Sequence, residues 1–191
     1  MSFRSKRGVV VIEQWDENDP VDATALAWLR ERPGTPVAGI GIVTRVWRLA
    51  KLFGEDRRRI LAAAGADPAT LDLLSVLRRA GAPYQLTTRE LTERTRVTAG
   101  AISQRVARAE NSGLVERARA ADSSRAVTVT LTPAGHALVE SLVDQVLHRE
   151  AELISCLAPH QRAALTELLR VLLGDVQEQV GLRRHTQVGS G

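Results

Sequence analysis

Two closely spaced helix starts constrain this chain more than any other feature of its sequence. Thr87 and Glu90 have the spacing of a capping box, in which each side chain satisfies the other residue's backbone N–H at the start of a helix. Thr98 is placed to cap a second helix, which Gly113 ends. The sequence therefore predicts a short helix over 88–94, a tight turn, and a second helix over 98–112.

A predicted β-hairpin follows this helix pair directly. The sequence LVERA begins at Leu114 and is typical of a short strand, and VTVTLT alternates so that Val127, Val129 and Leu131 share one face. Thr132 and the proline after it then cap the next helix. A helix, a tight turn, a helix and a hairpin in this order predict a winged helix-turn-helix.

The rest of the chain is predicted to be helical. Hydrophobic residues make up 44% of the sequence but aromatic residues only 3%, which favours packed helices over a β-sandwich. The fold class we predict is mainly α with a small β-hairpin wing. Three- and four-residue spacing of apolar side chains places the remaining helices at 20–32, 37–64, 68–80, 134–156 and 160–180.

The second helix of the pair has one apolar face, formed by Ile102, Val106 and Ala109, which we expect to pack on the body. Its opposite face is small or polar and suits a major groove about 12 Å wide. Gln104 can pair with adenine, and Arg108 can reach guanine or a phosphate. A solvated helix face is the alternative. The predicted DNA-binding residues of this helix are Thr98, Gly100, Ser103, Gln104, Arg108 and Asn111.

The hairpin tip adds two predicted DNA contacts, Ser124 and Arg125, because a wing can place an arginine in the adjacent minor groove. The formal net charge of +4 suits a polyanionic partner, although many ordinary proteins share it.

Several classes of function are not favoured. No apolar run approaches the length of a membrane span or a signal peptide. The four histidines show no metal-ligand spacing, and no catalytic motif or cofactor-binding loop is present. We therefore expect no enzyme activity and no cofactor. The single cysteine, Cys156, fits a reducing cytoplasm; its apolar neighbours favour a buried, inert thiol over a redox switch.

Two charged residues lie in apolar surroundings. Asp72 interrupts the apolar helix 68–80, and it either needs a partner or remains partly exposed near the helix start. Arg105 falls about 60° from the centre of the apolar face of its helix, so it flanks the body and not the groove. A buried acid is therefore a plausible partner for Arg105.

Residues 37–180 resemble the MarR family of transcription regulators, above all in SGLVER and the ending VTVTLTPAG. The resemblance implies a homodimer in which helices 37–64 and 160–180 interlock, bound to a near-palindromic operator in double-stranded DNA. Ser123 departs from the family, which has an acid there. The domains it implies are an irregular segment 1–19, an extra helix and first dimerisation helix 20–64, a DNA-binding domain 65–135, dimerisation helices 136–182 and a flexible tail 183–191.

The chain further resembles a subgroup of that family that responds to urate and related anions and has an additional N-terminal helix. The resemblance places the ligand-binding residues at Trp28, Asp72, Arg105 and Arg117, with Trp15 as the alternative tryptophan. Two guanidinium groups can hold an anion by bidentate contacts while an indole covers its flat face.

These features together predict a cytoplasmic repressor that a small anion releases from its operator. Two arginines can bind several kinds of anion, so the ligand could be urate, another purine, a phenolic acid or a polycarboxylate. The alternatives are a DNA-binding regulator without a ligand and a helical dimer that binds only another protein; activation in place of repression also stays open.

Overall fold

The computed structural model describes residues 15–119 and 126–181. The chain divides into two compact units, Met1–Val139 and Glu140–Gly191. Most of the predicted irregular segment 1–19 and all of the predicted tail 183–191 lie outside the described residues, as do Ser123, Ser124 and Arg125 at the wing tip.

Both helices of the predicted pair are present, as α4 (Thr88–Thr95) and α5 (Ala99–Asn111). The capping box is formed: the Thr87 N–H donates to Glu90 Oε2 at 2.7 Å, and the Glu90 N–H donates to Thr87 Oγ1 at 3.2 Å. The Thr98 hydroxyl oxygen accepts from the Ala101 N–H at 3.3 Å. Arg96 ends α4 in the left-handed region, with φ 56°, which produces the tight turn.

The wing belongs to a three-stranded antiparallel sheet and is not an isolated hairpin. Strands β2 (Val115–Arg119) and β3 (Val127–Leu131) form the hairpin, and β1 (Gln85–Thr87) pairs with the other edge of β3. The sequence prediction missed β1 because three residues are too few to show an alternating pattern. This strand runs directly into the capping box of α4, so the sheet fixes where the helix pair begins.

The central position of β3 changes the expected alternation along that strand. Val129 and Leu131 are buried as predicted, but Thr128 on the threonine face is buried as well. Its hydroxyl donates to the Ala118 carbonyl at 3.1 Å, which satisfies the polar group inside the sheet.

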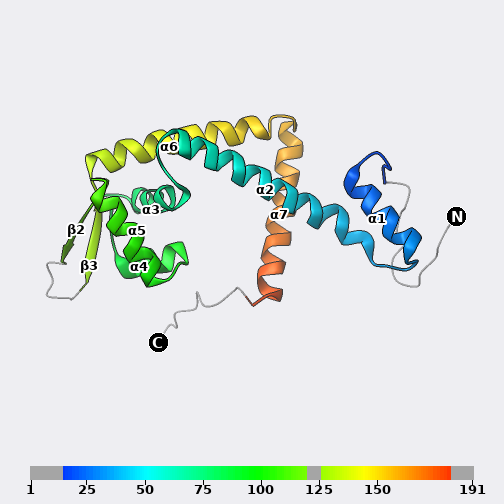
Figure 1. Cartoon of the computed structure of the whole chain (residues 1–191), viewed down its shortest axis with the longest axis horizontal. Helices are drawn as coiled ribbons and strands as arrows, with labels where there is room; N and C mark the ends of the chain where they lie inside the picture. Colours follow the sequence, from blue (N-terminus) through cyan, green and yellow to red (C-terminus); the bar gives the residue numbers. More distant parts are fainter. Residues whose placement is uncertain (1–14, 120–125, 182–191) are drawn as a thin grey trace. The chain divides into compact units, whose positions relative to one another are not determined.

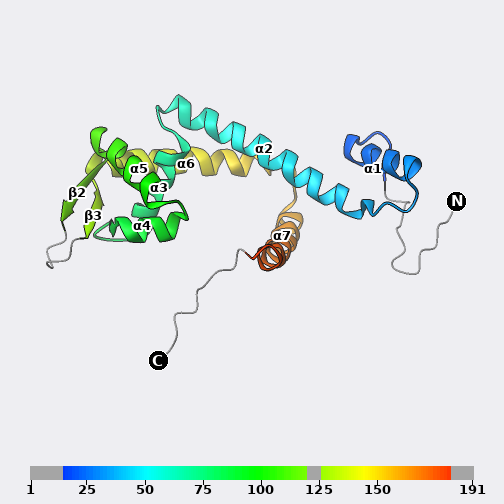
Figure 2. The ribbon, with the colours of Figure 1, turned by 60° about the horizontal axis from the view of Figure 1, so that its bottom comes forward.

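Helix α3 (Pro68–Arg79) supplies the core under the helix pair. Asp67 caps it, and Leu73, Leu74 and Leu77 are fully buried. Figures 1 and 2 both show α3, α4 and α5 gathered beside β2 and β3. The apolar side chains of α3 therefore support the helices that the sequence predicts to meet DNA. The predicted fold class, mainly helical with a small winged-helix sheet, is confirmed.

The extra N-terminal helix α1 (Pro20–Glu31) packs against the 3₁₀ turn η2 (Val37–Gly39) and α2 (Ile40–Ala63). One guanidinium joins the helices: Arg45 Nη2 lies 2.8 Å from Asp19 Oδ1 and 3.0 Å from Asp22 Oδ1. Asp19 also caps α1, because its carboxylate accepts hydrogen bonds from the backbone N–H groups of Asp22 and Val21. These hydrogen bonds lower the pKa of the Asp19 carboxyl below its usual value.

The long helices, which the family resemblance assigns to a dimer interface, leave most of their apolar stripes exposed in the single chain. In α2 the fully buried side chain is Leu61, near its end, whereas Trp47 in its middle is 72% exposed. Helix α7 (Pro159–Gln179) has no buried residue at all. The apolar side chains do line one face of each helix, as the sequence indicates. Such a stripe shows that a face is apolar, but it does not show which molecule covers that face.

Helix α6 (Pro133–Leu153) completes the described elements and ends three residues before the predicted 156. No single helix among the described residues is long and apolar enough to cross a membrane. The pair α2 and α3 meets the criteria of length and hydropathy only when both are counted together across an 84° bend.

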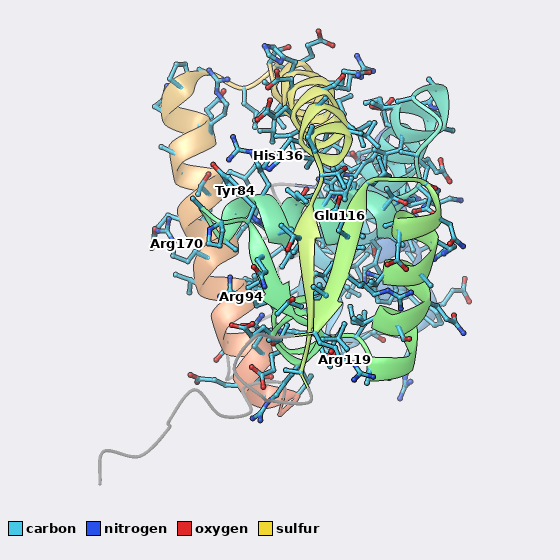
Figure 3. All side chains as sticks on the ribbon, turned by 90° about the vertical axis from the view of Figure 1, so that its left-hand side faces the viewer. Tyr84, Arg94, Glu116, Arg119, His136 and Arg170 are labelled. Carbon is cyan, nitrogen blue, oxygen red and sulfur yellow. The ribbon has the colours of Figure 1, made fainter. Side chains whose placement is uncertain are left out.

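A tight junction joins the wing to the start of α6. The Thr132 hydroxyl donates to the Gly113 carbonyl at 2.7 Å and accepts from the Gly135 N–H at 3.0 Å. A Cβ on Gly135 would lie 2.0 Å from the Leu114 carbonyl oxygen, so only glycine fits. Nearby, the Tyr84 and His136 rings meet in a T-shaped arrangement with centroids 4.5 Å apart, and Figure 3 shows these side chains next to each other.

We predict that Gly135→Ala lowers the free energy of unfolding by about 2–3 kcal/mol, because the added methyl group collides with backbone and must displace α6 or the strand end. Denaturant titration measures the change. Gly100→Ala is the matched control: nothing lies within 4 Å of the added atom, and the helical position favours alanine by up to about 1 kcal/mol. Equal effects of the two substitutions would contradict the predicted collision.

Candidate DNA-binding interface

The outward face of α5 has the geometry that the sequence predicts. Ile102, Val106 and Ala109 are buried against the body. The opposite side is open to solvent, and nothing approaches Gly100 within 4 Å. A helix that is anchored on one face and bare on the other can enter a groove without rearrangement. The predicted contact residues of this helix, all exposed, are Thr98, Gly100, Ser103, Gln104, Arg108 and Asn111.

Strands β2 and β3 extend from the end of α5 as the wing. Glu116 and Arg119 project from β2 in Figure 3, and Arg119 pairs with Val127 at the described end of the hairpin. Arg119 therefore brings a positive charge to the last described position before the tip. The predicted tip contacts Ser124 and Arg125 lie outside the described residues and stay predictions.

Arg105 and Asp72 are brought together at the edge of α5 that faces α3. Arg105 Nη1 lies 3.8 Å from Asp72 Oδ2, and the arginine side chain is only 19% exposed. No described residue accepts a hydrogen bond from this buried Nη1. The sequence suggested a buried acid as the partner of Arg105. In the structure Asp72 is 60% exposed, and the arginine is the more buried member of the pair.

A second acid of α3 meets α5 at the same edge. Asp67 Oδ2 lies 3.4 Å from Arg108 Nη1, while its Oδ1 accepts the Thr70 N–H at 2.7 Å. The Thr70 hydrogen bond is the main reason that the pKa of Asp67 is lowered, and the charge of Arg108 lowers it further. Sequence analysis assigned Asp67 only as a helix cap, because nothing in the linear pattern shows that two helices meet there.

Arg117 lies at the other edge of α5 and pairs with Glu110. Its Nε donates to Glu110 Oε2 at 2.8 Å, and its Nη2 contacts the same oxygen. Arg105 and Glu110 are five residues apart, which places them about 140° apart around the helix. Arg117 also lines a hollow of about 500 Å³ with Ser103, Val106 and residues of α4. The structure therefore separates Arg117 from the Asp72–Arg105 pair.

Trp28 is on α1 and is 51% exposed. Among the described residues, no recorded hydrogen bond, ion pair or ring contact joins Trp28 or Trp15 to Asp72, Arg105 or Arg117. Of the four predicted ligand-binding residues, the structure brings together Asp72 and Arg105. Glu110 and Asp67 are the partners that the sequence analysis missed.

Cys156 is exposed at the turn between α6 and α7, so the preference for a buried thiol is wrong for the single chain. Its apolar neighbours indicated burial, but Ile154 beside it is also exposed. Within residues 15–119 and 126–181, no group of three His, Cys, Asp or Glu side chains could hold a metal ion.

The supported helix pair and its strand wing define a winged helix-turn-helix DNA-binding protein. Residues 64–126 match the family model described as "MarR family". The match covers the two helices and the first wing strand, and it identifies this segment as the DNA-binding part of a MarR-type transcription regulator.

Individual relatives agree with this assignment. The transcriptional regulator PecS of Dickeya dadantii (strain 3937) is 24% identical over 153 residues, covering 80% of this chain and 90% of PecS. Sco3205 of Streptomyces coelicolor, solved in complex with DNA, is 25% identical with a TM-score of 0.60, covering 70% of this chain and 87% of that one. A mutant of MarR from E. coli, complexed with operator DNA, is 26% identical with a TM-score of 0.56, covering 71% of this chain and 98% of that one.

We predict that Glu110→Gln lowers thermal stability above the usual glutamate pKa of 4.5 and loses this effect in acid. Arg117 lowers the pKa of Glu110 through its hydrogen bond and charge, so the pair stabilises the fold above pH 4.5 and is lost as the pH falls through the folded-state pKa. Melting temperatures of both proteins between pH 3 and 7 measure the difference. Glu116→Gln is the control, and a constant difference at all pH values would contradict the prediction.

Proposed function

We propose that the protein is a homodimeric repressor that binds a near-palindromic operator and is released by a small anion. The observation that carries the proposal is the dual environment of α5. Its outward face presents Gln104, Arg108 and Asn111 to solvent, while Arg105 at its edge has an unfilled, buried hydrogen-bond donor. One helix thus offers a surface for DNA and a point of attachment for an anion.

The DNA contacts follow from the placement of side chains on α5. Gln104 and Asn111 lie within the outward face, so they are our candidates for base edges or phosphates. Arg108 borders that face and reaches either guanine or a phosphate. Thr98, Gly100 and Ser103 line the start of the helix, where small side chains permit close approach. We keep the assignment of residues 65–135 to DNA binding.

The homodimer is supported by the exposed apolar side chains of α2 and α7. A helix without a single buried residue and with exposed aliphatic side chains over most of its length is unstable alone in water. A second copy offers the same two faces, and a two-fold axis places two recognition helices against two half-sites. The exposed aliphatic residues of α7 are Leu165, Leu168, Leu169, Val171, Leu172, Leu173 and Val176.

We predict that the double substitution Leu168→Glu with Leu172→Glu converts the dimer to monomers at micromolar concentration, because it places charges within the apolar face. Light scattering after gel filtration gives the mass of each species. The matched control is Glu167→Ala on the polar side of α7, which should remain dimeric. A wild-type protein that is monomeric would contradict the proposed dimer.

The proposed anion contact is the Arg105–Asp72 pair. A guanidinium with a free donor binds a carboxylate or an anionic heterocycle by charge-assisted hydrogen bonds. Such an anion would compete with Asp72 and change how α5 is held against α3. Binding that favours this displaced state lowers operator affinity by linkage. Trp28 and Arg117 stay predictions as further ligand contacts.

We predict that a ligand raises the apparent Kd for the DNA upstream of the chain's own gene by about 5–150-fold in wild type and not in Arg105→Ala. The measurement is an electrophoretic shift titrated with urate, then with aromatic acids, then with polycarboxylic acids. Arg105→Ala must still bind the DNA for the comparison to be valid. Arg105→Lys is the matched control, which keeps the charge and loses the bidentate geometry.

The outcomes separate the proposal from its alternatives. If the protein binds tightly and no anion releases it, the regulator acts without a ligand. If no duplex binds even at low salt, the DNA-binding proposal fails and a helical protein-interaction dimer takes its place, because phosphate contacts are strongest under those conditions.

A further inference from the structure

Asp67 has two partners in two different helices. Its Oδ1 accepts the Thr70 N–H at 2.7 Å and so caps α3, whereas its Oδ2 faces Arg108 Nη1 of α5 at 3.4 Å. The side chains of Asp67 and Arg108 are 47% and 64% exposed, so the pair lies at the surface. One oxygen of the carboxylate thus serves the cap, and the other faces the arginine.

Arg108 is placed where it can leave Asp67 for DNA. It follows Gln104 by one helical turn, so Arg108 at the rim is a neighbour of a side chain within the outward face. Asp67 approaches Arg108 from the start of α3, the helix that α5 packs against. An arginine at such a rim has a carboxylate partner in the free protein and a phosphate or guanine partner in a complex.

We propose that Asp67 sets the affinity of this regulator for DNA by holding Arg108 in the DNA-free state. When the protein binds DNA, Arg108 exchanges its contact with Asp67 for a contact with DNA. Part of the free energy of the new contact therefore only compensates for the loss of the ion pair. The carboxylate is exposed, so the restraint is modest and does not prevent binding. This inference rests on the proposed contact between Arg108 and DNA.

Asp67→Asn separates the two functions of the residue. Asparagine caps helices as well as aspartate does, so α3 and its core keep their support. The amide carries no charge, so it releases Arg108 and does not repel phosphate. Asp67→Asn therefore tests the restraint on Arg108 without the loss of stability that an alanine at the cap would cause.

The experiment is a fluorescence anisotropy titration of the full chain with a labelled duplex from the DNA upstream of its own gene, at 50 and 200 mM salt. We expect Asp67→Asn to bind about 3–10-fold more tightly than wild type at 50 mM salt, with a smaller gain at 200 mM. The melting temperature of the variant should fall only slightly, because asparagine keeps the cap and only the weak surface ion pair is lost. Glu116→Gln, an exposed acid on β2, removes the same charge and should change affinity less than 2-fold.

A double-substitution cycle distinguishes the restraint from a general change in charge. In an Arg108→Ala background, Asp67→Asn should have no effect on affinity, because its partner is already absent. The proposal is overturned if Asp67→Asn binds no more tightly, or if its gain persists without Arg108. If Arg108→Ala itself binds DNA as well as wild type, the proposed DNA contact of Arg108 is wrong, and this inference fails with it.

Discussion

The burial of one face of α5 is the interaction on which the rest of the structure depends. Ile102, Val106 and Ala109 pack into the core built from α3, α4 and the sheet, and this packing determines which side of α5 remains bare. Because the apolar face is anchored, the polar face has a fixed direction. Between the buried face and the polar face, α5 has two edges. Every ion pair of α5 described above lies on one of these edges.

The two edges give α5 different neighbours. Toward α3, Arg105 meets Asp72 and Arg108 meets Asp67. On the opposite side Glu110 binds Arg117 of the wing strand. The recognition helix is thus joined by charge to the helix behind it and to the wing beside it. A change of partner at one edge can alter how the helix is presented to DNA.

The junction between the wing and α6 connects the DNA-binding elements with the helix that leads away from them. Thr132 binds the carbonyl of Gly113 at the end of α5, and Gly135 permits backbone contact with Leu114. Hydrogen bonds and close backbone packing leave little freedom at this point. The start of α6 is therefore held against the end of α5.

Local sequence rules determined most of the elements. Thr87 with Glu90, Thr98 and Asp67 each cap the helix that the sequence predicts, because capping depends only on residues a few positions apart. The exposed face of α5 followed from its helical period in the same way. These features could be predicted because their interactions are short in sequence and repeat regularly along the chain.

Only the tertiary structure decided the contacts between elements. Asp67 and Arg108 are far apart in sequence, as are Thr128 in β3 and the carbonyl it satisfies in β2, so no local pattern indicates these pairs. The apolar stripes of α2 and α7 were visible in the sequence, but a stripe does not show whether its cover comes from the same chain. The physical reason is common to all these cases: a side chain's local pattern defines what it needs, and the fold decides which group supplies it.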